Sequence, residues 1–321
     1  MRKLFLTFIL LIPLVSSFGQ RIDNLASYRN VTGEKYFRIH YDNDFYGKTD
    51  YYYTQGYNFE FVNPGLRKNP LTRTLLHLKN SRTKYGISFE HYGFTPTSIK
   101  SNEILRNDRP FAGVIMIKSF AASVDTLHKS RLTSVLSTGM LGPAAFAGKM
   151  QKKIHSWTGD QEPMGWQYQI KNEVVVNYEL NYEKEIFNVP NIISLNTNSG
   201  IRLGTLSDKI QGGATITIGR FDSPFQTHEK RIKNNYQLYF YMQPLVSLVG
   251  YDATMQGGII NRSSPYTLTA GQINRFTLQN SYGVILSVRN LYVEYYRTYL
   301  SKEFETGRTH KWGGLKIGFA F

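Results

Sequence analysis

Side chains that could bind a cation are concentrated in residues 41–56 of this chain. This stretch carries four closely spaced carboxylate or amide groups, on Asp42, Asn43, Asp44 and Asp50. Oxygen donors of this kind are the ligands that a hard cation such as calcium prefers in proteins. Aspartate, asparagine and glycine are also the usual residues of tight turns, so the spacing alone leaves open both a calcium site and an ordinary hairpin turn.

A second candidate group lies in residues 142–172, where the pattern predicts a helix that carries a histidine. Pro143 suits the first helical turn, and Gly159 suits the residue that ends a helix. Three residues share one face of this helix, namely Gly148, Gln151 and His155. A lone histidine is more often an ordinary surface residue, but beside an acidic stretch His155 becomes a candidate general base.

A different face of the same helix is apolar. Its members recur at helical spacing and are Phe146, Met150, Ile154 and Trp157. A helix with such a stripe has to bury it against something. We therefore expect this face to pack against the upper wall of the protein and to hold His155 over the neighbouring strand ends.

Alternation of polar and apolar residues predicts that strands position both groups. Twelve segments alternate in this way, at residues 35–44, 53–62, 84–93, 112–123, 131–141, 173–184, 192–204, 212–221, 236–248, 275–288, 291–300 and 312–321. Most are about ten residues long, which is the length a tilted strand needs to cross a bilayer. The pattern predicts an all-β fold, a twelve-stranded antiparallel transmembrane β-barrel with a short extracellular helix after the fifth strand.

The two ends of the chain agree with an outer-membrane barrel. Residues 1–19 combine two basic residues, an apolar core and small residues, which predicts a secretory signal peptide. Residues 20–321 then form a single barrel domain, although the length would also suit two soluble domains. There is no cysteine, which excludes disulfides, and no apolar run long enough for a transmembrane helix. The last strand alternates and ends on Phe321, as outer-membrane barrels do, although a soluble sandwich could also end this way.

The order of the predicted strands places the polar stretches at one end of the barrel. If both termini lie in the periplasm, the connections after odd-numbered strands face the outside of the cell. The acidic stretch follows the first strand, residues 94–111 follow the third, and residues 142–172 follow the fifth. We therefore expect these three connections to meet on the extracellular rim. One periplasmic connection, residues 63–83, is unusually long and contains a helix-like stretch at residues 71–79.

The first half of the chain carries a series of short motifs. They are N-D-F at residues 43–45, T-D-x-x-Y-T-x-G at 49–56, Y-G-F-T-P at 92–96, D-R-P-F-A-G at 108–113, G-P at 142–143, Q-K-K-I-H at 151–155, G-W-x-x-Q at 165–169 and N-E at 172–173. In this order they resemble the motifs of the outer-membrane lipid A 3'-O-deacylase (LpxR) family. Each motif is weak alone, but their shared order is specific. The second half of the chain matches only as barrel strands.

The resemblance implies a hydrolase that removes the ester-linked 3-hydroxyacyl group at the 3' position of lipid A in the outer membrane. It assigns Asn43 and Asp44 to a calcium site that holds the developing oxyanion, and His155 to the activation of water. It also implies that Thr54 lines the site. Gln151, one helical turn before His155, would orient the water or the substrate.

The basic residue of the site departs from the family pattern. The family lysine falls in the loop after a Thr-Pro pair, where this chain offers Lys100. Arg109 is a second candidate for contact with a phosphate or the oxyanion, because a guanidinium matches phosphate geometry. An Asp-Arg pair at a strand start also serves as a loop brace. The net charge of +15 suits lipopolysaccharide as the anionic partner, although a merely basic surface fits as well, and no nucleic-acid motif occurs.

Two other classes of function remain compatible with the sequence. One is an outer-membrane phospholipase that uses a similar barrel rim, and the other is an inactive barrel that binds lipopolysaccharide. No G-x-S-x-G motif occurs, which argues against a serine nucleophile on a sharp strand-to-helix turn. The joint presence of Asn43, Asp44, Thr54 and His155 argues against a barrel that has lost its activity.

Overall fold

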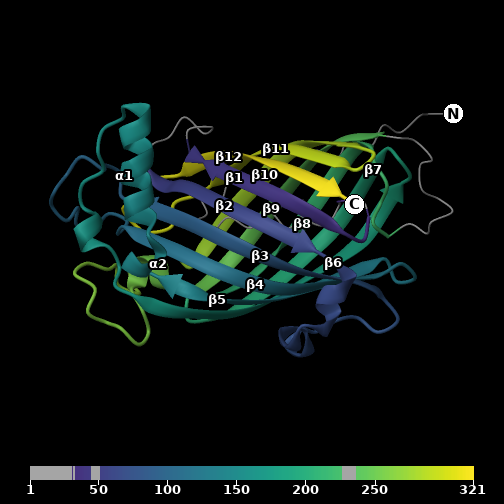
Figure 1. Cartoon of the computed structure of the whole chain (residues 1–321), viewed down its shortest axis with the longest axis horizontal. Helices are drawn as coiled ribbons and strands as arrows, with labels where there is room; N and C mark the ends of the chain where they lie inside the picture. Colours follow the sequence, from purple (N-terminus) through teal and green to yellow (C-terminus); the bar gives the residue numbers. More distant parts are fainter. Residues whose placement is uncertain (1–30, 32, 45–50, 226–235) are drawn as a thin grey trace, which may run out of the picture.

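The computed structural model of the chain is a closed barrel of twelve antiparallel strands, in which each strand pairs with its neighbours in sequence and β12 pairs with β1 (Figure 1). The structure describes residues 31, 33–44, 51–225 and 236–321. The strands are β1 Tyr36–Asn43, β2 Tyr52–Val62, β3 Arg82–Thr95, β4 Ala112–Asp125, β5 Ser130–Leu141, β6 Glu173–Val189, β7 Ile193–Gly204, β8 Ser207–Arg220, β9 Tyr236–Asp252, β10 Phe276–Val288, β11 Leu291–Leu300 and β12 His310–Ala320. The predicted number and order of strands are confirmed. The predicted signal peptide, residues 1–19, lies outside the described residues.

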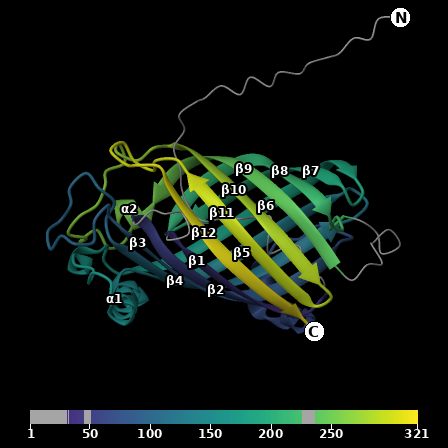
Figure 2. The same ribbon diagram turned by 90° about the horizontal axis from the view of Figure 1, so that it is seen from above.

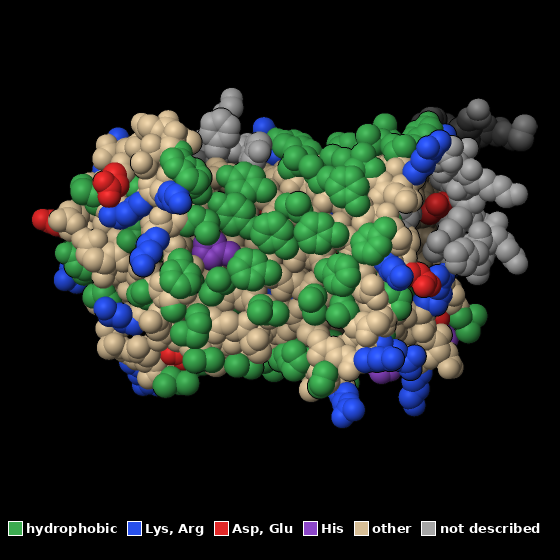
Figure 3. Space-filling model, viewed as in Figure 1, with side chains coloured by type: hydrophobic (Ala, Val, Ile, Leu, Met, Phe, Trp, Pro, Cys, Tyr) green, Lys and Arg blue, Asp and Glu red, His purple; other side chains and the backbone are tan. Residues whose placement is uncertain are grey.

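Alternation of side chains between the two faces of each strand explains why this sequence forms a barrel wall. In β10, Val284 and Leu286 are 46% and 40% exposed on the outer face, whereas Gln279 and Ser281 are buried on the inner face. Figure 3 shows apolar side chains spread over the middle of the wall and basic side chains gathered towards both ends. An apolar band outside and polar residues inside are what a barrel in a membrane requires.

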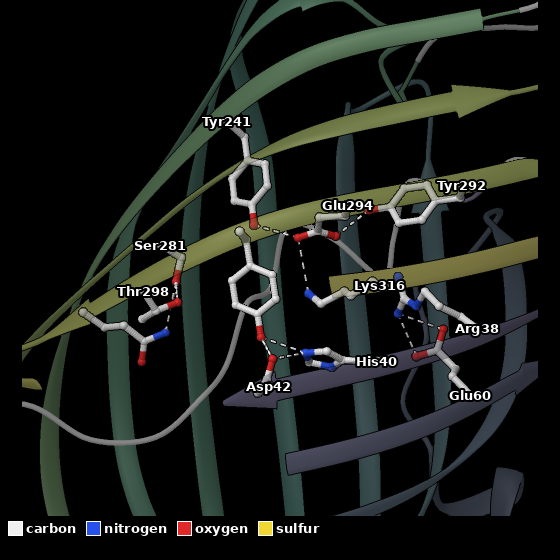
Figure 4. Close-up of polar contacts among 12 residues, drawn as sticks. Arg38, His40, Asp42, Glu60, Tyr241, Ser281, Tyr292, Glu294, Thr298 and Lys316 are labelled. Atoms are coloured by element: carbon white, nitrogen blue, oxygen red, sulfur yellow. Dashed lines mark hydrogen bonds and ion pairs between the residues drawn. The ribbon is translucent and has the colours of Figure 1, made fainter. Parts of the chain in front are cut away.

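Paired charges occupy the inside of the barrel (Figure 4). Arg38 Nη2 donates to both carboxylate oxygens of Glu60 at 3.0 Å. The carboxylate of Glu294 accepts from Lys316 Nζ at 3.3 Å. Two hydroxyls also donate to Glu294, at 2.7 and 2.6 Å, from Tyr241 and Tyr292. Each of these buried charges has an opposite charge beside it, which is the condition under which ions are tolerated away from water.

The connections differ between the two ends of the barrel. Tyr36 of β1 lies opposite Ala320 of β12, so the first and last strands begin and end at the same end. Short turns such as residues 289–290 join strands there, which is typical of the periplasmic end. Longer connections at the other end carry short helices, among them η4 Pro143–Ala145, α1 Ala147–Thr158, η5 Trp166–Tyr168 and α2 Ala253–Gln256. Figures 1 and 2 show α1 against the outside of the wall. Among the described residues, no helix is long and apolar enough to span a membrane.

The long periplasmic connection between β2 and β3 differs from its prediction. Instead of a helix over residues 71–79, it contains two 3-10 helices, η2 Pro64–Lys68 and η3 Pro70–Thr74. Each begins after an asparagine whose side chain accepts from the backbone, Asn63 from Gly65 N and Asn69 from Leu71 N. Each asparagine cap, with the proline that follows it, begins a new helix. Because two helices begin within a few residues, no longer helix forms.

Candidate functional site

Asp42, the first residue of the predicted cation group, belongs to the inside of the barrel. It is 3% exposed. Its carboxylate accepts a hydrogen bond from the Tyr296 hydroxyl and lies 2.5 Å from His40 Nε2 (Figure 4). Because these partners line the lumen, Asp42 does not join the other members of the group. This part of the prediction is wrong, and the cause is the period-two alternation of β1.

Asn43 is the last residue of β1 and lies on its outward face, and Asp44 comes directly after the strand. Asn43 belongs to the same outward row as Ile39, which is 43% exposed, and its Nδ2 donates to the Tyr41 hydroxyl at 3.2 Å. Asp44 follows the strand and is 6% exposed. Asp50 lies outside the described residues. The oxygen donors that the described chain presents here are therefore those of Asn43 and Asp44.

Thr54 occupies a β-bulge near the start of β2. The pairing of β2 with β3 shifts between Tyr53 and Gln55, so Thr54 is the additional residue. A bulge turns a side chain away from its regular direction, and Thr54 Oγ1 lies 3.1 Å from Thr95 Oγ1 at the end of β3. Gln55 lies opposite Asn43 in the ladder between β1 and β2. Thr54 is therefore the residue before the ladder partner of Asn43, and its role in lining the site stays a prediction.

Small residues allow α1 to approach the outer wall of β3 and β4. A Cβ atom at Gly113 would lie 2.6 Å from the Cβ of Ala147, and one at Gly93 would lie 3.4 Å from it. His91 fixes the turn that precedes the helix, because its Nε2 lies 2.7 Å from the carbonyl oxygen of Ala145. This contact is not evident from the sequence, although His91 directly precedes the Y-G-F-T-P motif.

The face that α1 buries is not the predicted apolar one. Ala147, Gly148 and Gln151 are the buried residues of the helix. Phe146 is 55% exposed and Trp157 is 75% exposed. The prediction that the apolar stripe packs on the barrel is wrong for Phe146 and Trp157, whereas Met150 and Ile154 are half-buried. The closest approach to the wall, over Gly93 and Gly113, is made by the small residue Ala147. Phe146 and Trp157 are left on the helix surface, where Lys149 and Lys153 lie over their rings.

His155 is held in an orientation that suits a general base. The helix ends at Gly159, whose φ of 74° is left-handed and whose N–H donates to the carbonyl of His155. The chain then returns so that the carbonyl oxygen of Gln161 lies 2.6 Å from His155 Nδ1. A carbonyl can only accept, so Nδ1 carries the hydrogen, and in the neutral ring Nε2 is left as the acceptor. The sequence did not indicate this contact.

Gln151 connects α1 to the segment that follows it. Its Oε1 accepts a hydrogen bond of 2.7 Å from Trp166 Nε1, and the ring of Trp166 lies over Gly148, where a Cβ would be 2.8 Å away. The side-chain oxygen of Gln151 is thus engaged in positioning the helix. The side-chain NH2 group of Gln151 is left for water or substrate. Trp166 belongs to the G-W-x-x-Q motif, so the sequence held a signal for it.

Lys100 lies in the connection between β3 and β4, which packs beside α1. Its neighbour Ile99 is buried in a cluster with Phe111 and Trp166. The carbonyl of Ile99 also accepts a 2.7 Å hydrogen bond from Met164 N. This packing carries Lys100, which is itself exposed, to the same end of the barrel as α1.

Arg109 lies in the same connection but points elsewhere. Its side chain is fully buried and pairs with Glu303, donates to Thr254 Oγ1 at 2.8 Å, and lies over the ring of Phe94 at 3.8 Å. Burial raises the pKa of Glu303 to about 7, and Arg109 opposes that shift. A guanidinium held in this way is not placed to meet a lipid phosphate. The structure therefore corrects the expectation for Arg109 in favour of the loop brace.

The side chains at the end of β1 fit calcium by the chemistry of their donors. In the described part of the chain, no group of three or more His, Cys, Asp or Glu residues could hold a metal ion. The amide of Asn43 and the buried carboxylate of Asp44 supply oxygen donors only. Calcium takes about 6–8 oxygen ligands, some of them water. Two protein side chains would therefore form a weak site completed by water, backbone or substrate.

The fold and this geometry define a class of protein, an outer-membrane β-barrel with a polar site on its extracellular side. The candidate residues come from the extracellular ends of β1 and β2, from the connection after β3 and from α1, which packs on the outer wall over Gly93 and Gly113 (Figures 1 and 2). The chain belongs to the LpxR family: the model described as outer membrane protein LpxR matches residues 4–321. This is a family of lipid A deacylases.

The solved structure of LpxR from Salmonella typhimurium agrees with the fold. LpxR from Salmonella typhimurium superimposes with a TM-score of 0.74 at 16% sequence identity, covering 89% of this chain and 100% of that one. The β domain of the Bordetella autotransporter BrkA gives a TM-score of 0.48 at 10% identity, covering 90% of this chain and 100% of that one. A comparison with curated protein sequences gives no match.

Proposed function

We propose that this protein hydrolyses the ester that links the 3-hydroxyacyl group to the 3' oxygen of lipid A in the outer leaflet. In this reaction the hydroxyl of a water molecule adds to the acyl carbonyl, and a proton goes to the sugar oxygen. The products are a free 3-hydroxy acid and a lipid A with an open 3' hydroxyl. Membership of the LpxR family supports the substrate.

The observation that carries the proposal is the orientation of His155. Its Nδ1 hydrogen is committed to the carbonyl of Gln161, so Nε2 accepts the proton of the attacking water. The helix that carries it packs on the outer wall at the extracellular end, over Gly113. A lipid substrate remains in the membrane, and a site on the outer face of the wall meets it without extracting it from the leaflet.

Asn43 and Asp44 are proposed to hold a calcium ion next to the acyl carbonyl of the bound substrate. Such an ion supplies Lewis-acid stabilisation of the charge that develops on the carbonyl oxygen, worth several kcal/mol. Thr54, turned by the β2 bulge, lines the site beside these two residues. Gln151 fixes α1 and offers its amide group to water or substrate.

Lys100 is proposed as the basic contact for substrate. It is exposed in the connection that packs beside α1, whereas Arg109 in the same connection is buried against Glu303. Lipid A carries phosphates on its sugars, and a lysine ammonium on a flexible stem meets a phosphate as a point charge.

Mass spectrometry of lipid A tests the function. We expect cells that carry the protein to lose the mass of one 3-hydroxyacyl group from their lipid A. The variant His155→Ala should lose this activity by at least about a hundredfold, the usual effect of removing a general base. The barrel should still assemble, as judged by the migration of unheated protein in gel electrophoresis.

The variant His128→Ala is the matched control, because His128 is exposed in the periplasmic turn between β4 and β5 and pairs with Asp125. It should act as the parent does. Loss of assembly together with activity in His155→Ala would show a structural role instead. Release of fatty acid from glycerophospholipid with lipid A unchanged would favour the phospholipase, and no change in either lipid would favour a binding barrel.

A further inference from the structure

The connection between β2 and β3 covers part of the outer wall at the periplasmic end of the barrel. After η2 and η3 the chain runs through residues 75–78 without regular secondary structure. The carbonyl of Thr74 accepts from the Tyr178 hydroxyl at 2.8 Å, and the carbonyl of Leu76 accepts from Ser134 Oγ at 2.7 Å. The amide of Leu78 donates to Ser123 Oγ at 3.0 Å. The connection is therefore fixed to β4, β5 and β6.

These contacts lie on the side of the wall that faces lipid elsewhere. Ser123 lies in the same outward row of β4 as Ile117, which is 59% exposed, yet Ser123 is fully buried. Tyr178 lies in the same outward row of β6 as Val176, which is 45% exposed. The connection has thus replaced lipid over this part of the wall. The outer surface of the connection, rather than the strands, faces the membrane there.

That outer surface combines apolar and basic side chains. Leu71 and Leu76 are 44% and 55% exposed. Four exposed basic residues surround them, namely Arg67, Lys68, Arg73 and Lys79. Residues 63–83 contain no acidic residue, and within the described chain none of these four side chains forms an ion pair. Figure 3 shows basic side chains gathered where Figure 1 draws this connection. We call these six residues the linker surface.

We propose that the linker surface binds anionic phospholipid headgroups in the periplasmic leaflet of the outer membrane. Exposed leucines flanked by lysine and arginine are the composition of segments that lie in a membrane interface. The leucines enter the acyl region beside the lipid-facing wall, and the basic groups meet the phosphates. This inference does not depend on the proposed enzymatic activity, since α1 and its histidine lie at the opposite end of the barrel.

A free phosphate ion would engage the basic groups alone and would give no reason for exposed leucines between them. A protein partner would cover the leucines and shield them from lipid. The two alternatives therefore differ from the proposal in whether acyl chains reach the leucine side chains.

The test uses fluorescence quenching in the whole folded barrel. The variant Leu76→Trp is reconstituted into phosphatidylcholine bilayers that contain a minor share of brominated phosphatidylglycerol or, separately, of brominated phosphatidylcholine. The emission of the parent protein, which has three native tryptophans, is subtracted. We expect brominated phosphatidylglycerol to quench the introduced tryptophan with an apparent affinity roughly fivefold higher than that of brominated phosphatidylcholine. This ratio is equivalent to about one contact between a basic side chain and an anionic headgroup.

Two further variants make the result specific. Leu238→Trp, on the lipid-facing row of β9 at the same end, should show no preference between the two lipids, since Leu238 is 49% exposed away from the linker surface. Changing Arg67, Lys68, Arg73 and Lys79 to Gln in the Leu76→Trp protein should abolish the preference. Leu71→Trp serves as a second reporter if Leu76→Trp fails to assemble.

Three results would overturn the proposal. Equal quenching by both lipids at the linker surface would mean that charge plays no part. An equal preference in Leu238→Trp would mean a general effect of the whole barrel. Absence of quenching by either lipid, in both reporter variants, would mean that another molecule or the protein itself covers this surface.

Discussion

At the scale of single residues, the pair of Arg109 and Glu303 shows how a side chain suited to phosphate recognition can serve the fold. The Arg109 guanidinium joins Glu303, after β11, to Thr254 in α2, after β9. Thr254 in turn donates to Asp252 Oδ1 at 2.5 Å. The connections that follow β9 and β11 at the extracellular end therefore both bind the buried guanidinium of Arg109. Removal of one partner from such a pair typically destabilises a protein by about 3–5 kcal/mol.

The pair also predicts a pH dependence of stability. Burial raises the pKa of Glu303 from 4.5 to about 7, so its contribution to the folded state is complete below about pH 4.5 and is lost as the pH rises through about 7. In Glu303→Gln the neutral amide replaces the titrating group. We expect the free energy of unfolding of the parent barrel to fall by up to about 3 kcal/mol over this pH range, which thermal denaturation detects as a lower midpoint temperature. The variant should lack this component.

The matched control for this prediction is Glu305→Gln, because Glu305 is exposed in the same connection. It should keep the pH dependence of the parent. The assignment to Glu303 would be refuted if Glu303→Gln and the parent changed in parallel with pH.

At the scale of elements, the position of α1 depends on glycines in the wall rather than on the apolar stripe of the helix. A Cβ at Gly113 would lie 2.6 Å from the Cβ of Ala147. We expect Gly113→Leu to push the helix away from β4 and to lower deacylation at least about tenfold, since small displacements of catalytic groups have effects of this order or larger. The barrel should still assemble, because the new side chain points outward. Lipid A mass spectrometry and gel migration measure the two effects.

Gly212→Leu provides the comparison for this element. Gly212 is an exposed glycine of β8, and a Cβ there would meet only the carbonyl oxygen of Asn198, at 3.9 Å. It should leave activity and assembly as in the parent. A fully active Gly113→Leu protein would show that the contact with Ala147 does not position His155.

At the scale of the whole molecule, activity and folding should respond differently to removal of metal. The barrel is closed by twelve paired strands, and the proposed calcium donors, Asn43 and Asp44, lie at one strand end. A chelator should therefore stop deacylation without changing gel migration. Calcium should restore activity better than zinc, because oxygen-only donors favour a hard cation. Full activity in excess chelator would remove calcium from the proposed mechanism.

Because the paired strands close the barrel without help from its two ends, one barrel can present different surfaces to the two leaflets. The extracellular end carries α1 with exposed Phe146 and Trp157, and the periplasmic end carries the linker surface. Both lie outside a wall whose interior is filled with paired charges (Figure 4). Changes in either surface need not disturb the ladders that close the barrel.

The sequence by itself determined the features that depend on neighbours along the chain. Period-two alternation located all twelve strands, and Gly159 ended the predicted helix. These features follow from local sterics and from the alternation that a barrel wall imposes. The order of the motifs in the first half of the chain also led to the correct family.

Only the tertiary structure decided which side chains face one another. Arg109 and Glu303 are 194 residues apart, and nothing near Arg109 in the sequence shows that its partner will be a buried carboxylate. The buried face of α1 was set by Gly93 and Gly113 in another part of the chain. Helical spacing reports that a face is apolar, but whether that face meets protein or lipid depends on the space that distant strands leave. In a membrane protein both choices satisfy an apolar side chain, so the pattern alone cannot distinguish them.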